Sequence, residues 1–111
     1  MNTDRIYKNA QKGDNTRESI LAHALALSHE VGYEVVTRNA IAERAGCSGP
    51  LISMYFGGMR NLRKAIMREA IKHEDLAVIA QGLAAKDKEA QKASAHLKMQ
   101  ALATLIQEMP S

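Results

Sequence analysis

The chain has 111 residues, a length that suits one small domain with room for an added helical arm. Only 4% of the residues are aromatic and none is tryptophan, whereas Ala, Leu, Ile and Met are plentiful, so the composition favours packed helices over a β-sandwich. Lys and Arg outnumber Asp and Glu by 15 to 12, and residues 1–73 hold 11 of the basic against 7 of the acidic side chains. This basic excess in the N-terminal part suits phosphate binding.

The residue types that carry chemistry do not form a recognisable active site. The single cysteine, Cys47, excludes an internal disulfide, suits a reducing cytoplasm and is expected to pack in a turn. The pair His29-Glu30 lacks the second histidine of a zinc-protease helix. Without a nucleophile–base order, a glycine-rich phosphate loop or a carboxylate cluster, we expect no enzyme, no catalytic residue, no metal and no cofactor. The polar N-terminus and the absence of an apolar run of ~20 residues predict neither a signal peptide nor a membrane span.

The first expected elements are an arm and a helix. Residues 1–14 are polar and lack a periodic apolar face, which predicts a flexible N-terminal arm. The capping-box pattern Asn-Thr-Arg-Glu then predicts a helix over residues 16–31, ended by Gly32. In the short connection that follows, we expect Tyr33 and Val35 to enter the core.

Two short helices around a tight turn are predicted next, over residues 38–45 and 49–56. Thr37 and Ser48 carry side-chain oxygens suited to cap the two helices, and Gly46 between them can adopt a positive φ at the end of the first. Two helices joined by a short glycine turn form the helix-turn-helix unit, whose second helix enters the major groove of DNA. The sequence therefore predicts a DNA-binding domain, which we place over residues 15–58.

The rest of the chain, residues 59–111, is predicted to be a helical dimerisation region. After a Gly-Gly break, one long helix is expected to end near Gly82, with an apolar stripe of Leu62, Ile66, Ala70, His73 and Ala77. Residues 83–93 are either a hinge or a frayed helical turn. Ser94 can cap a last helix. Its apolar residues are Leu97, Ala101, Leu102, Leu105, Ile106 and Met109.

The order of these signals resembles the DNA-binding domain of TetR-family transcriptional regulators. The resemblance covers about residues 16–70, half of the chain. The matching residues are Gly32-Tyr33, Thr37, Ile41-Ala42, Ala45-Gly46-Cys47-Ser48, Leu51-Ile52-Ser53 and Tyr55-Phe56. It implies an all-α fold, with a three-helix TetR-like helix-turn-helix domain followed by one long and one C-terminal helix.

Three features depart from the family pattern. Ser53 stands where such regulators usually carry a tyrosine, and Met59 and Arg60 replace the usual Lys and acidic residue. The chain continues for only about 40 residues after the match, whereas the family has a much longer ligand-binding and dimerising region. A bundle that encloses a pocket needs more helices, so we expect a truncated regulator without a small-molecule effector, of a kind suited to a phage or plasmid genome.

DNA contacts are expected from the second helix of the unit and from nearby basic residues. Residues on the outward face of that helix can reach base edges, and the helix amino ends can donate N–H groups to phosphate. Lys64 is either a phosphate contact or a solvated helix residue, and a basic arm with Arg5, Lys8 and Lys12 is either a minor-groove contact or a disordered tail. The expected DNA-binding residues are Thr37, Arg38, Asn39, Ser48, Gly49, Pro50, Leu51, Ser53, Met54, Tyr55, Arg60 and Arg63.

The sequence thus predicts a cytoplasmic, sequence-specific transcriptional regulator that represses by occupying an operator on double-stranded DNA. Helix-turn-helix domains usually bind as dimers, and we expect a homodimer through the helices at 62–81 and 94–109. One alternative is a DNA-binding adaptor of a phage or plasmid packaging or replication assembly. The other is a protein-interaction module that keeps the fold but no longer binds DNA.

Overall fold

The computed structural model describes the backbone of residues 3–108 and the side chains of residues 16–107. Its helices are α1 (Thr3–Val31), α2 (Arg38–Ala45), α3 (Gly49–Phe56), α4 (Met59–Lys72), α5 (Leu76–Ala84) and α6 (Ala95–Glu108), with two 3₁₀ helices, η1 (Tyr33–Val35) and η2 (Ala90–Lys92). The all-α class is confirmed, because this range holds no strand. Within it, every helix is too short or too polar to cross a membrane.

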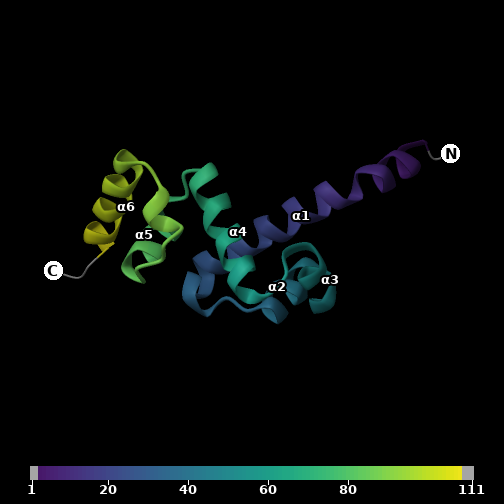
Figure 1. The fold of residues 1–111 in the computed structure, drawn as a ribbon, viewed down its shortest axis with the longest axis horizontal. Helices are drawn as coiled ribbons and strands as arrows, with labels where there is room; N and C mark the ends of the chain where they lie inside the picture. The colour runs from purple at the N-terminus through teal and green to yellow at the C-terminus, as the bar shows by residue number, and fades with distance from the viewer. Residues whose placement is uncertain (1–2, 109–111) are drawn as a thin grey trace.

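The helices form two packed groups that share α4 (Figure 1). Helices α1, α2, α3 and α4 pack around one another, while α5 lies on α4 and α6 lies on the outer side of α5. The amino-terminal half of α1 extends away from the rest, so the first helix and α6 lie at opposite ends of the molecule. This arrangement leaves α2 and α3 exposed beside each other.

The first helix is longer than the sequence indicated. It begins at Thr3 and not at residue 16, so residues 3–14, expected to be a separate arm, continue the backbone of α1. The expected start of this helix was wrong because it was read from the apolar face, which ends where the helix leaves the core. A polar stretch without proline can continue a helix beyond that point. Residues 1 and 2 lie outside the described range.

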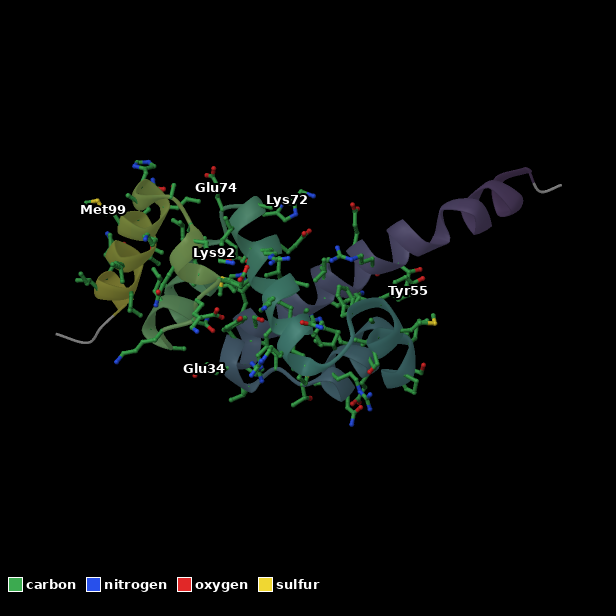
Figure 2. All side chains as sticks on the ribbon, viewed as in Figure 1. Glu34, Tyr55, Lys72, Glu74, Lys92 and Met99 are labelled. Carbon is green, nitrogen blue, oxygen red and sulfur yellow. The ribbon has the colours of Figure 1, made fainter. Side chains whose placement is uncertain are left out.

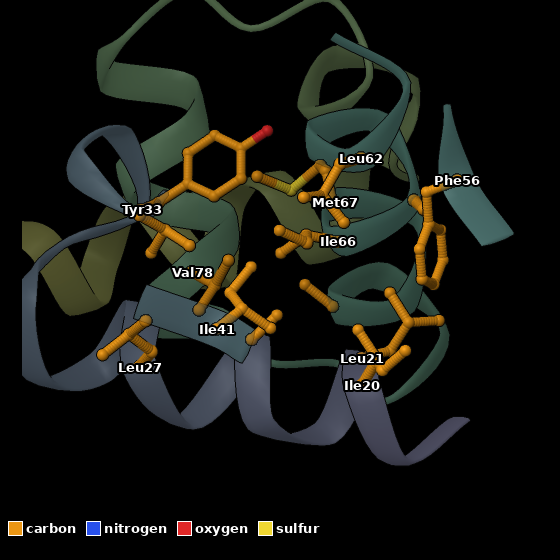
Figure 3. Close-up of a cluster of buried hydrophobic side chains, with 14 of the residues drawn as sticks. Ile20, Leu21, Leu27, Tyr33, Ile41, Phe56, Leu62, Ile66, Met67 and Val78 are labelled. Carbon is orange, nitrogen blue, oxygen red and sulfur yellow. The ribbon is translucent and has the colours of Figure 1, made fainter. Parts of the chain in front are cut away.

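The core is built from the inner faces of α1, α2, α3, α4 and α5 (Figure 3). Ile66 of α4 and Ile41 of α2 are fully buried within it. Tyr33 is buried as expected, but Val35 is not. Val35 is 61% exposed, whereas Val36 is 1% exposed. The 3₁₀ turn of η1 explains this correction, because alternate burial holds only for an extended segment.

The expected long helix is in fact two helices. Helix α4 ends at Lys72, Glu74 follows with a positive φ of 54°, and Asp75 begins α5 by accepting a hydrogen bond from the backbone N–H of Val78 at 3.3 Å. The second oxygen of the Asp75 carboxylate lies 2.8 Å from Nε2 of His29 at the end of α1. These contacts redirect the chain so that α5 packs back onto α4.

Gly82 lies inside α5 and does not end a helix. It is buried, and a Cβ added there would collide with the side chain of Met67 and come within 2.9 Å of Cβ of Ala90. A glycine is therefore needed for α4, α5 and η2 to approach so closely. The segment from Ala85 to Ala93 is neither a hinge nor a frayed turn, since Glu89, Ala90 and Ala93 are buried.

Helix α6 forms where it was predicted. The hydroxyl of Ser94 accepts a hydrogen bond from the backbone N–H of Leu97 at 3.1 Å. Ala101 is buried against α5, whereas an outer stripe stays exposed. This stripe consists of Met99, Leu102 and Ile106. Met109 lies outside the described residues.

Glu89 holds the segment before α6 against α4. Its carboxylate lies 2.9 Å from Nε of Arg68 on α4 and 2.8 Å from Nζ of Lys92 on η2. The hydrogen bonds from Lys92 and Arg68 hold the pKa of Glu89 below its ordinary value of 4.5. The ionised form of Glu89 is thus favoured by folding.

We expect acid to remove this contribution to stability. Because the pKa of Glu89 is lower in the folded than in the unfolded chain, the contribution is complete above about pH 4.5 and is lost as the pH falls through the folded pKa. Thermal melts of the wild type and of Glu89→Gln at about pH 7 and about pH 3 measure it. The Tm of the wild type should exceed that of the variant at the higher pH, and this difference should be smaller at the lower pH. An equal Tm difference at both pH values would contradict this account.

Candidate nucleic-acid interface

Helices α2 and α3 meet in a helix-turn-helix whose boundaries are those predicted from the sequence. Thr37 caps α2 by accepting a hydrogen bond from the N–H of Ala40 at 3.1 Å, and Ser48 caps α3 by accepting one from the N–H of Leu51 at 3.2 Å. Gly46 ends α2 in the left-handed conformation with φ 72°. Local residue chemistry therefore determines both helix starts and the turn between them.

Helix α3 has one buried and one exposed side. Ile52 and Phe56 point into the core, which fixes the helix on the domain. Ser48, Pro50 and Met54 are exposed, and Met54 is 72% exposed. Between these sides lie the half-buried residues Gly49, Leu51, Ser53 and Tyr55. The predicted residues of α3 thus occur together along one outward face and its edges.

Arg38 links the start of α2 to the middle of α3. Its Nη1 donates a hydrogen bond to Oγ of Ser53 at 2.8 Å. The guanidinium also lies close to Gly49, where an added Cβ would meet Nε of Arg38 at 3.0 Å and Oδ1 of Asn39 at 3.1 Å. The glycine therefore lets the two helix starts pack closely, and Arg38 fixes the position of the Ser53 hydroxyl.

The two arginines of α4 that were predicted to bind DNA have different surroundings in the structure. Arg60 is exposed in the first turn. The guanidinium of Arg63 donates to the backbone carbonyls of Tyr33 at 3.1 Å and Val36 at 3.3 Å. These bonds hold the segment that leads into Thr37. Arg63 therefore positions the start of α2, a role that its place in the sequence did not indicate.

Tyr33 connects the segment before α2 to the C-terminal part of the chain. Its hydroxyl donates to the carboxylate of Asp87 and lies 3.1 Å from the carbonyl oxygen of Arg63. Burial, together with the Asp87 carboxylate, raises the pKa of Tyr33 above its ordinary value, so this hydroxyl stays protonated. The backbone N–H of Tyr33 also donates to the side-chain oxygen of Gln81 on α5.

Sequence reasoning missed Arg17. Its guanidinium carbon lies 5.0 Å from the centre of the Phe56 ring, so α1 places a cation beside the end of α3. Arg17 is far from α3 in the sequence, and nothing in its local pattern indicates this contact. The side chains of Arg5, Lys8 and Lys12, expected as a basic arm, lie outside the described part of the chain.

Comparison with known proteins gives two matches. Residues 20–66 match the family model described as bacterial regulatory proteins of the tetR family. The HTH-type transcriptional regulator BetI 2 of Chromohalobacter salexigens is 37% identical to the chain over 71 residues, which cover 64% of the chain and 34% of that relative. The chain therefore spans about a third of the length of the curated relative that it matches. No solved structure matches the chain significantly.

Proposed function

We propose that this chain, whose residues 20–66 match the family model of the tetR bacterial regulatory proteins, is a DNA-binding regulator that binds a defined operator sequence as a homodimer. The match to the family's DNA-binding domain supports the role of a DNA-binding regulator. In our proposal the bound dimer represses transcription by occupying the operator. The observation that carries the proposal is the oriented hydroxyl of Ser53 at the edge of the exposed side of α3.

The Arg38–Ser53 bond determines what Ser53 can recognise. A guanidinium can only donate hydrogen bonds, so the Ser53 oxygen accepts from Arg38 and the hydroxyl proton remains available. In the major groove this proton suits the acceptors O6 and N7 of guanine, N7 of adenine and O4 of thymine. Ser53 would therefore favour an acceptor edge over the amino groups of cytosine and adenine.

Other exposed groups of the same face supply the remaining contacts. Met54 offers an apolar surface for a thymine methyl group. Thr37, Asn39 and Arg60 are exposed and can meet phosphates, which fix the orientation of the domain without reading the sequence. The amino end of α4 adds N–H donors, because its N-cap residue is Gly58, which has no capping side chain.

We propose that α6 forms the dimer contact. The apolar stripe of α4 is not available for this purpose, because Leu62, Ile66 and Ala70 are buried in the chain's own core. On α6, Met99, Leu102 and Ile106 are exposed at a spacing of three and four residues, so they lie on one helix face. A second α6 packed against this face would bury all three side chains.

Replacing Ile106 with aspartate is expected to prevent dimer formation, because a charge in an apolar contact is costly to bury. Sedimentation at micromolar concentration should give a dimer for the wild type and a monomer for Ile106→Asp. Gln107→Asp adds the same charge at an exposed neighbouring position and should remain dimeric. A monomeric wild type would refute the α6 contact.

Selection from a random duplex pool, followed by footprinting, tests the proposed function. A dimer should select an inverted repeat with half-sites about 34–36 Å apart, one DNA turn or a multiple of it. The footprint should cover both half-sites. Failure to enrich any sequence would contradict operator binding, and enrichment of a single half-site would contradict the dimeric mode.

A further inference from the structure

A cleft of about 480 Å³ lies between α1 and α4, beside the end of α3. Its floor is apolar and includes Leu21, Phe56 and Ala65. Its rim carries Tyr55 and Asn61 at one end and charged side chains along the rest. The dimer contact does not use this cleft, and the proposed DNA face of α3 meets it only at Tyr55.

The rim of the cleft is strongly basic. The cations are Arg17 from α1 and Lys64, Arg68 and Lys72 from α4, against the single carboxylate of Glu69. Glu69 is engaged by His73 at 2.9 Å, and Arg68 is engaged by Glu89 at 2.9 Å. Arg17 and Lys64 form no ion pair with a described carboxylate. Among the described side chains the unpaired charge of the cleft is therefore positive, which favours an anion as its ligand.

Arg17 is held in place before any ligand arrives. Its guanidinium stacks over the buried ring of Phe56, and this contact restricts a side chain that is otherwise flexible. Ordering an exposed arginine costs conformational entropy, so a cation that is already positioned binds an anion at lower cost. Lys64 lines the same cleft from α4, across from Arg17 on α1.

The position of the cleft identifies the anion. Tyr55 belongs to α3 and Asn61 to the first turn of α4, so this end of the cleft continues the proposed DNA face. Figure 2 shows Tyr55 beside α3 and Lys72 at the far, carboxyl end of α4. Lys72 follows Lys64 by two helical turns, a separation of about 12 Å along the helix. A duplex seated on α3 would thus pass the Tyr55 end of the cleft and not the Lys72 end.

We propose that Arg17, Asn61 and Lys64 bind a phosphate of the DNA backbone next to the base-reading footprint. This inference rests on the proposed function. The site adds affinity that is independent of base sequence and depends on salt, because each neutralised phosphate releases counterions. The cleft would thereby supplement the small and mostly uncharged contact face of α3.

Salt titrations of duplex binding test this proposal. Arg17→Gln and Lys64→Gln should each reduce the slope of log K against log salt by about 1, equally for the selected duplex and for a scrambled one. Lys72→Gln, in the same cleft but beyond the reach of the duplex, should keep the wild-type slope. Arg17→Lys retains the charge and should retain most of the slope, which separates loss of charge from loss of packing on Phe56.

The outcomes distinguish this inference from the proposed function. If the wild type binds its operator but Arg17→Gln and Lys64→Gln keep the full slope, the phosphate site is refuted and operator binding stands. If the wild type binds no duplex, both fail. Inorganic phosphate titrated into the DNA-free protein and followed by NMR provides a second check. Shifts at Lys72 as large as those at Lys64 would mean that a soluble anion fills the whole cleft, and would overturn the assignment to DNA.

Discussion

Replacing Met67 with alanine is expected to lower the free energy of unfolding by about 2–5 kcal/mol. Met67 of α4 is 0% exposed and is one of the core side chains in Figure 3. Its end packs against Gly82 of α5, where an added Cβ would collide with it. Truncation removes buried apolar atoms and leaves a cavity that the surrounding helices fill only in part. Because small domains are stable by about 5–15 kcal/mol, urea denaturation should show a large loss of stability.

Met54→Ala is the matched control for this substitution. Met54 is 72% exposed on α3, so the same change should alter the unfolding free energy by no more than about 0.5 kcal/mol. If Met67→Ala were as mild as Met54→Ala, the packing of α5 on α4 would be looser than described. The continuous core across the two groups of helices would then be wrong.

Replacing Arg38 with alanine is expected to weaken operator binding about 10- to 100-fold, or about 1.4–2.8 kcal/mol. The change removes the hydrogen bond that orients Ser53 and the packing of the guanidinium on Gly49. Ser53→Ala should leave phosphate contacts intact and relax the base preference at one position. Fluorescence anisotropy with the selected duplex and its single-base variants measures both effects.

Arg44→Ala provides the control on the same helix. Arg44 pairs with Glu30 of α1 at 2.6 Å, and both side chains are well exposed, so its loss should change stability and DNA affinity only slightly. Equal losses of affinity for Arg38→Ala and Arg44→Ala would show that general charge, and not the oriented Ser53 hydroxyl, governs binding. Unchanged affinity for Arg38→Ala would remove Arg38 from the site.

The helix-turn-helix was predictable because its signals are local. Thr37 and Ser48 each cap a helix through a bond to the N–H three residues later, and Gly46 adopts the positive φ that its position requires. Such short-range chemistry can be read directly from a sequence. The bounds of α2 and α3 therefore agree with those expected.

Features that depend on tertiary contacts were not predictable in the same way. The break between α4 and α5 falls at Glu74, which has no glycine or proline to mark it, and it is fixed by Asp75 and by the contact of Asp75 with His29. Only the side chain of Asp75, a common N-cap, could have indicated it. The choice of Val36 over Val35 for the core likewise depends on the turn of η1.

The same distinction applies to the site. Exposed residues of α3 follow from helical periodicity, so the outward position of Met54 could be expected. The roles of Arg63, which bonds the carbonyls before α2, and of Arg17, which stacks on Phe56, come from contacts between residues distant in the sequence. Charge alone cannot separate an arginine that supports a site from one that contacts a ligand.

The most direct test of the central claim compares the affinity for the selected duplex with that for a scrambled duplex of the same composition, across a range of salt concentrations. We predict that the selected duplex binds at least about 1,000-fold more tightly, and that log K for both duplexes falls linearly with log salt. Equal affinity for the two duplexes, or binding that does not change with salt, would contradict a sequence-specific regulator.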